Sequence, residues 1–142
     1  MSSFEKMISL IIPFYNSAST LQKCLASVEE QSIDKNSLEV ILVNDGSDDG
    51  SVEIAKDFAS RNSFATIITQ LHSGSGAARN SGITAARGKY IAFLDSDDTL
   101  SADALKSAVD FFEENGEKTD ILALKLVPYT NSGRKNCDFK NQ

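Results

Sequence analysis

The chain has 142 residues, of which 41% are hydrophobic and 24% charged, and its formal net charge is -6 at pH 7. These values exclude an intrinsically disordered protein, and no apolar run approaches the roughly 18 residues that a membrane-spanning helix needs. Acidic residues outnumber basic ones by 20 to 14, which excludes a surface built to coat nucleic acid. One small anion can still bind locally, beside a metal ion, an Arg or a helix N-terminus.

The length predicts a single domain over residues 1–142. The two cysteines, Cys24 and Cys137, lie far apart and fit no metal-ligand spacing, so we interpret both as free thiols in a reducing cytosol. The N-terminal residues lack the small-residue cleavage site of a secretory signal. Together these features predict a cytoplasmic protein.

The first half of the chain predicts two strands and two helices. The first strand covers residues 8–12 and is followed by a helix capped by Ser19, because residues 19–22 have the capping-box form Ser-x-x-Gln. Cys24 lies on the apolar face of this helix and is interpreted as a packing residue. The second strand covers residues 38–43, and the second helix begins after Gly50.

The second half of the chain continues the alternation of predicted strands and helices. A third strand at residues 65–68 precedes a helix over residues 76–87, and a fourth strand at residues 90–94 precedes a helix from Ser101 to Asn115. Residues 121–127 predict a fifth strand. Several of the strands are continuous apolar runs, which are typical of strands covered on both faces. The order predicts an α/β fold with an open, mostly parallel, twisted sheet and helices on both faces.

In such a sheet, ligands bind beyond the carboxyl ends of the strands. Four predicted loops at those ends carry polar side chains and glycines, at residues 13–16, 44–50, 72–80 and 95–98. Polar loops are ordinary in α/β proteins. A cluster of three acids directly after an apolar strand is less ordinary, and it makes the loop at residues 95–98 the strongest candidate site.

These three acids, Asp95, Asp97 and Asp98, would repel one another at pH 7 without a positive charge between them. A divalent cation supplies that charge, and Mg²⁺ or Mn²⁺ prefers oxygen ligands, including phosphate oxygens and water. The alternative interpretation is a helix start, in which Asp98 or Ser101 caps the next helix. We favour the metal, because one cap does not require three acids.

A second alternative is a phosphohydrolase of the haloacid-dehalogenase type, in which Asp95 attacks a phosphoryl group and Asp97 acts as acid and base. That chemistry needs a further acidic pair at the end of a later strand, and the chain offers none there. It also leaves the loop at residues 44–50 without a role.

Four segments in order, ISLIIPFYN at 8–16, VNDGSDD at 43–49, AARNSG at 77–82 and YIAFLDSDD at 90–98, resemble the family 2 nucleotide-diphospho-sugar glycosyltransferases. The resemblance covers nearly the whole chain, from about residue 8 to residue 127, and implies the GT-A fold. It also implies a transferase that moves a sugar from a nucleotide-diphosphate donor, most often a UDP-sugar, to an acceptor hydroxyl with inversion. A module that binds nucleotide sugars without transferring them stays open as an alternative.

The resemblance also implies roles for the first two loops. Pro13, Tyr15 and Asn16 would line the donor's base and ribose. Asp45, with Gly46 beside it, would hydrogen-bond the base. A departure is His72, in a position where many relatives have Asn, and we interpret it as a hydrogen-bonding loop residue rather than a catalyst.

For the other two loops the resemblance implies contacts with the phosphates and the metal. Arg79 would lie near the base and phosphates, and Ser96 would line the donor site. Asp95 would lie near the ribose and, with Asp97, bind Mg²⁺ or Mn²⁺. The metal would stabilise the diphosphate as a leaving group.

The acceptor half of such enzymes supplies the general base, and no plausible equivalent lies before Gln142. We therefore expect the chain to be a donor-binding domain that ends before the acceptor-binding region. Acceptors in this family include lipid-linked glycans and capsule and wall polymers. The resemblance is therefore compatible with peripheral association at the inner face of the membrane.

Overall fold

The computed structural model describes residues 4–116, so the predicted fifth strand at residues 121–127 and Cys137 lie outside the described residues. The elements follow one another in the predicted alternation. They are β1 (Lys6–Phe14), α1 (Leu21–Glu29), a 3₁₀ turn η1 (Lys35–Ser37), β2 (Leu38–Asn44), α2 (Ser51–Arg61), β3 (Ala65–Thr69), α3 (Ser75–Ala85), β4 (Gly88–Phe93) and α4 (Ala104–Asn115). Among the described residues, no helix combines the length and the hydropathy needed to cross a membrane.

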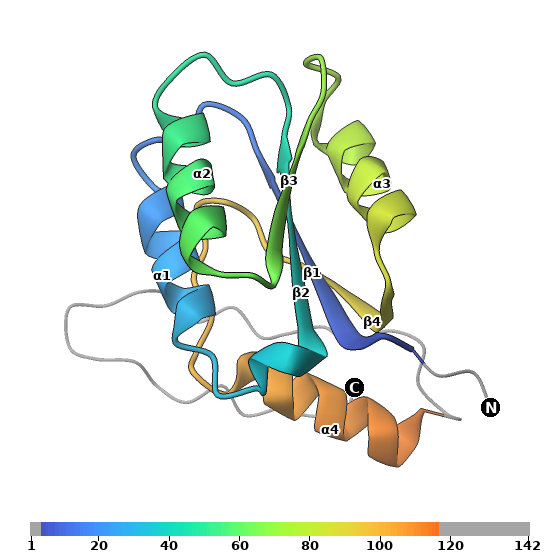
Figure 1. Cartoon of the computed structure of the whole chain (residues 1–142). Coiled ribbons are helices and arrows are strands. Elements are labelled where there is room, and N and C mark those ends of the chain that lie inside the picture. The colour runs from blue at the N-terminus through green and yellow to red at the C-terminus, as the bar shows by residue number, and fades with distance from the viewer. Residues whose placement is uncertain (1–3, 117–142) are drawn as a thin grey trace.

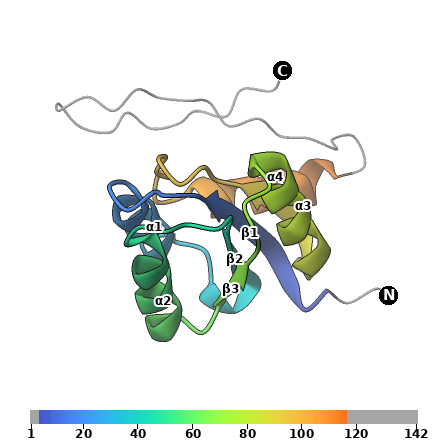
Figure 2. The same cartoon turned by 90° about the horizontal axis from the view of Figure 1, so that it is seen from above.

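The four strands form one parallel sheet in the order β3-β2-β1-β4. In Figure 1, α1 and α2 lie on one side of this sheet and α3 on the other, and Figure 2 shows the same layers from above. Helices on both faces of a parallel sheet confirm the predicted fold class.

The two faces of the sheet have cores of different size. Alternate residues of β1 and β2 point into the larger core, where α1, α2 and α4 contribute buried side chains such as Leu25, Phe58 and Leu105. The smaller core lies under α3 and includes Ile11 and Ala78. Gly82 lets α3 approach β1 closely, because a Cβ at that position would overlap Cγ2 of Ile11.

The fourth strand differs from the prediction. Its apolar run indicated burial on both faces, but β4 alternates, with Ile91 43% and Phe93 48% exposed. The reason is position: β4 is one of the two edge strands of the sheet in the described part of the chain, and α3 packs on β1 and β2.

Two predicted helix caps are also wrong. The N-cap of α1 is Thr20 rather than Ser19, and that of α4 is Asp103 rather than Ser101, without a side-chain capping bond in either case. The carbonyl of Ser101 instead accepts a hydrogen bond from the buried side chain of Gln31. The backbone carbonyl of Ser101 makes this tertiary contact, and not the hydroxyl that the capping prediction relied on.

The strand register determines where the loops emerge. Phe14 of β1 pairs with Asn44 of β2, which pairs with Thr69 of β3, so these three strands end at one level. On the other side of β1, Phe93 pairs with Ile11. Strand β4 therefore ends before the other three strands do, and the loop after it leaves a hollow at the carboxyl edge of the sheet.

Candidate functional site

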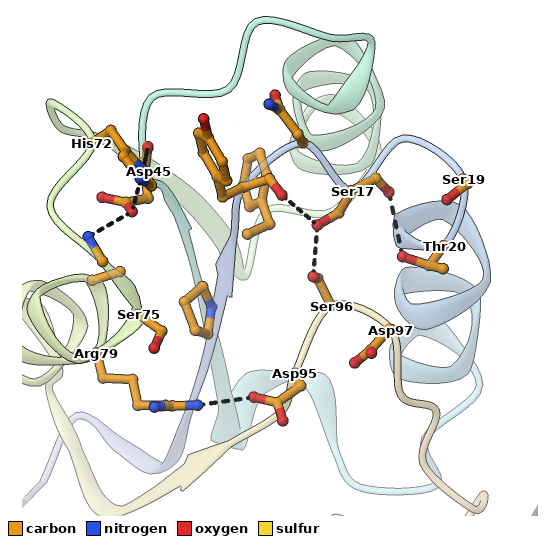
Figure 3. A pocket seen from close by; sticks show the side chains of 16 residues that line it. Ser17, Ser19, Thr20, Asp45, His72, Ser75, Arg79, Asp95, Ser96 and Asp97 are labelled. Carbon is orange, nitrogen blue, oxygen red and sulfur yellow. Dashed lines mark hydrogen bonds and ion pairs between the residues drawn. The ribbon is translucent and has the colours of Figure 1, made fainter.

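A pocket of about 460 Å³ lies in this hollow, at the carboxyl edge of the sheet. Figure 3 shows side chains from four loops around it. Its lining includes every residue predicted for the site except Gly46, namely Pro13, Tyr15, Asn16, Asp45, Arg79, Asp95, Ser96 and Asp97. The pocket thus brings together residues that are up to 84 positions apart (Pro13 to Asp97).

The loop after β1 is held by Asn16, which has a positive φ of 47° that Asn tolerates better than most residues. Its side-chain oxygen accepts a hydrogen bond from the backbone N–H of Asp48 at 2.9 Å, and its own N–H donates to Ser47 Oγ at 2.9 Å. Asn16 therefore fastens the first loop to the second and holds Tyr15, which is 46% exposed, over the pocket.

Asp49, in the same second loop, has a structural role. Its carboxylate accepts hydrogen bonds from the hydroxyl and the backbone N–H of Ser51, at the start of α2, and from the N–H of Ala18. The hydrogen bonds from Ser51 hold the pKa of Asp49 below its ordinary value. These bonds join the start of α2 to the chain ahead of α1.

Asp45 is 3% exposed, and its carboxylate accepts three hydrogen bonds and lies within ion-pair distance of His72. Oδ1 accepts from Gln70 Nε2 and the N–H of Ser73, both at 2.9 Å, and Oδ2 accepts from the N–H of Gly74 at 2.9 Å and lies 3.0 Å from His72 Nδ1. Burial raises the pKa of Asp45, but these hydrogen bonds and the charge of His72 outweigh it and lower the pKa below 3.8.

Gly46 shapes the site without lining the pocket. Its φ is +83°, and a Cβ at this position would lie 2.9 Å from the backbone nitrogen of His72. A side chain there would be strained and would push the loop at residues 70–74 away from Asp45.

His72 is the residue that the sequence prediction placed outside the binding set. Its ring stacks on Tyr15, with ring centroids 4.0 Å apart and an interplanar angle of 26°. Its Nδ1 also lies 3.1 Å from the backbone oxygen of Asp45, which confirms the interpretation as a hydrogen-bonding loop residue. The available signal was that His72 is the one histidine of the chain and departs from the family pattern.

The acids after β4 form a compact cluster. One carboxylate oxygen from each of Asp95, Asp97 and Asp98 lies within 4.8 Å of the other two. Asp95 and Asp97 are exposed, and Asp98 is half-buried. Burial, and then the charges of Asp97 and Asp95, raise the pKa of Asp98. Three oxygen ligands at this spacing fit Mg²⁺ or Mn²⁺. The N-cap alternative for Asp98 is wrong, because α4 begins only at Ala104.

Three contacts position the acid loop. Arg79 Nη2 of α3 donates to Asp95 Oδ1 at 3.1 Å, and Figure 3 shows the two side chains pointing toward one another. Ser96 Oγ lies 2.8 Å from Ser17 Oγ of the first loop. Below the cluster, the buried Cys24 donates its thiol to the backbone oxygen of Asp95 at 3.7 Å.

Cys24 is a packing residue, as predicted. Burial, and then the negative charges of Asp98, Asp97 and Asp95, raise the pKa of its thiol to about 12. The thiol therefore stays neutral beneath the acids.

Comparison with known proteins identifies the family that carries this arrangement. The model of Glycosyl transferase family 2 matches residues 9–136. The chain belongs to glycosyl transferase family 2. This membership overturns the alternative of a phosphohydrolase of the haloacid-dehalogenase type. The sheet with its four loops is the GT-A fold of the family.

Individual family 2 relatives support the assignment along most of the chain. An uncharacterized glycosyltransferase, EpsJ, of Bacillus subtilis (strain 168) is 40% identical over 109 residues, which cover 77% of this chain and 31% of EpsJ. A poly(ribitol-phosphate) beta-glucosyltransferase of Bacillus spizizenii is 36% identical over 135 residues, covering 94% of this chain and 21% of the relative.

Among solved structures, S. aureus TarS 1-349 in complex with UDP-GlcNAc superposes with a TM-score of 0.73 at 32% identity. The match covers 78% of this chain and 32% of that chain. The chain thus spans about a third or less of the length of each of these three proteins.

Proposed function

We propose that this chain is the donor-binding domain of a metal-dependent glycosyltransferase that moves a sugar from a nucleotide-diphosphate donor to an acceptor hydroxyl. The observation that carries the proposal is that two acids of the cluster, Asp95 and Asp97, line one pocket together with Arg79 and Tyr15. A nucleotide diphosphate needs these three things together: an aromatic ring for its base, a permanent cation, and a metal site for its phosphates.

The proposed donor pose runs from Tyr15 to the acid cluster. Tyr15 and Pro13 lie along the base and ribose, and Asp45 accepts a hydrogen bond from the base. Asp95 and Asp97 hold Mg²⁺ or Mn²⁺, with Asp98 as a third oxygen ligand within reach. When bound, the metal neutralises charge on the leaving diphosphate as a Lewis acid. Arg79 adds a fixed positive charge at the same rim.

UDP is the proposed nucleotide, and inversion at the anomeric carbon the proposed stereochemistry. The general base for the acceptor hydroxyl is expected beyond Gln142. Names of relatives support the substrate class: one is a poly(ribitol-phosphate) beta-glucosyltransferase, and the TarS structure contains UDP-GlcNAc. We propose a glycan or lipid-linked acceptor of the cell envelope, reached from the cytoplasmic face of the membrane.

Calorimetric titration with UDP in the presence of Mn²⁺ or Mg²⁺ tests the proposal, with EDTA removing the metal. We expect metal-dependent binding that Asp97→Ala weakens by at least about tenfold, because ligating carboxylates are needed for metal affinity. The matched control is Asp110→Ala, an acid on α4 that pairs with Lys106 and lies away from the pocket. Equal UDP affinity in the Asp97→Ala variant and the unmodified protein would refute the metal site.

The same titration, followed by an assay for sugar transfer and for donor hydrolysis, separates a transferase from a module that only binds. Binding without either reaction, in the protein that includes the acceptor-binding region, would favour the module.

A further inference from the structure

The side chain of His72 makes the two contacts that the proposed function assigns to the donor's base. Its flat aromatic ring stacks on Tyr15 with centroids 4.0 Å apart, and its Nδ1 lies 3.0 Å from Asp45 Oδ2. A pyrimidine base such as uracil offers the same combination, a flat ring with an N–H donor on its edge. The imidazole ring of His72 and the base of the donor therefore compete for the same position beside Tyr15 and Asp45.

The Asp45 carboxylate leaves little room for another donor. It offers about four lone-pair sites, of which three hydrogen bonds, from Gln70, Ser73 and Gly74, occupy three, and His72 Nδ1 lies 3.0 Å from Oδ2. Two of these donors are backbone N–H groups, of Ser73 and Gly74. A third, Gln70 Nε2, belongs to a side chain whose oxygen also accepts from Ser81. A base can reach the carboxylate only by displacing the His72 ring from its position beside Oδ2.

The local structure allows this replacement. The backbone of His72 is held against Gly46, where even a Cβ would approach within 2.9 Å. The side chain is 56% exposed, so its ring can rotate toward solvent while the backbone stays in place. The loop is thus fixed and only the ring has to move.

We infer that the His72 ring takes the position proposed for the donor's base and rotates toward solvent when the donor binds. The inference rests on the proposed function, because it takes Tyr15 and Asp45 as the base-binding pair. His72 is then a residue that lowers donor affinity, since only the fraction of molecules with the ring turned out can bind.

Removal of the ring should therefore tighten donor binding. Displacement of the His72 ring from its stacking contact with Tyr15 and from its ion-pair contact with Asp45 would lower the donor affinity by about threefold to tenfold. We expect His72→Ala to bind UDP with Mg²⁺ more tightly by this factor. Leu71→Ala is the matched control: Leu71 is the preceding residue, is 89% exposed and does not line the pocket.

NMR of the unmodified protein tests the movement without a mutation. His72 is the one histidine in the sequence, so its imidazole C–H signals are unambiguous. Stacking on Tyr15 should shift these signals upfield, and saturation with UDP and Mg²⁺ should move them to the position of a solvent-exposed histidine. The Tyr15→Leu variant without nucleotide supplies the reference for an unstacked ring.

The outcomes separate this inference from the proposed function. If UDP binds and the His72 signals stay upfield, or if His72→Ala binds UDP no better than Leu71→Ala, the inference is wrong and the proposed function stands. If neither the unmodified protein nor His72→Ala binds UDP or GDP, both fall. Tighter binding by His72→Ala together with the downfield movement establishes the displacement.

Discussion

The most informative single substitution is Asp45→Asn, which keeps the shape of the side chain and removes its charge. A carboxamide has one acceptor oxygen in place of two, so the donors at one carboxylate oxygen lose their partner. Whichever carboxylate oxygen the amide group replaces, a backbone N–H loses its acceptor: that of Ser73 at Oδ1 or that of Gly74 at Oδ2. An unsatisfied buried donor costs roughly 1–3 kcal/mol, and hydrogen bonds to a charged group are the stronger ones. We expect the free energy of unfolding to fall by about 2–4 kcal/mol.

The effect should depend on pH in a defined direction. The folded state holds the pKa of Asp45 below 3.8, its ordinary value, so the carboxylate stabilises the fold fully above that value. The stabilisation is lost as the pH falls through the lower pKa of the folded state. The difference in stability between the unmodified protein and Asp45→Asn should therefore be largest near pH 7 and shrink below about pH 4.

Urea unfolding followed by circular dichroism at pH 7 and pH 3 measures both effects. Asp48→Asn is the matched control, because it removes the same charge from an exposed position in the same loop. A surface change of this kind stays within about 0.5 kcal/mol. If Asp45→Asn is no less stable at pH 7 than Asp48→Asn, the description of Asp45 as a buried carboxylate held by three hydrogen bonds is wrong.

Two further predictions concern packing. Gly82→Ala should lower the free energy of unfolding by about 1–3 kcal/mol, because its Cβ would overlap Ile11. Gly76→Ala, on the same helix with nothing within 4 Å, should raise it by up to about 1 kcal/mol; urea midpoints of equal value for the two variants would contradict this. Cys24, with a pKa of about 12, should resist iodoacetamide at pH 8 in the folded protein and react in urea, and peptide mass spectrometry would reveal any labelling under native conditions.

The comparison of sequence with structure shows which features are local. The continuous apolar runs of β1 and β2 indicated strands buried on both faces, and they are buried throughout their apolar segments. The same reasoning was wrong for Ile91 and Phe93, because an apolar run does not say whether a strand lies at the centre or at the edge of a sheet. Likewise, Ser19 and Ser101 had the chemistry of caps, but the N-caps of α1 and α4 are Thr20 and Asp103.

The amino-acid sequence by itself determined the α/β class, the loops that face the site and the motifs of family 2, because strand periodicity, chain order and short motifs are properties of neighbouring residues. Only the tertiary structure decided that the His72 ring stacks on Tyr15 and that its Nδ1 lies 3.0 Å from the carboxylate of Asp45. Those contacts join residues 27 or more positions apart. They depend on how closely two loops pack, and that distance is set by the register of the sheet and by the missing side chain of Gly46.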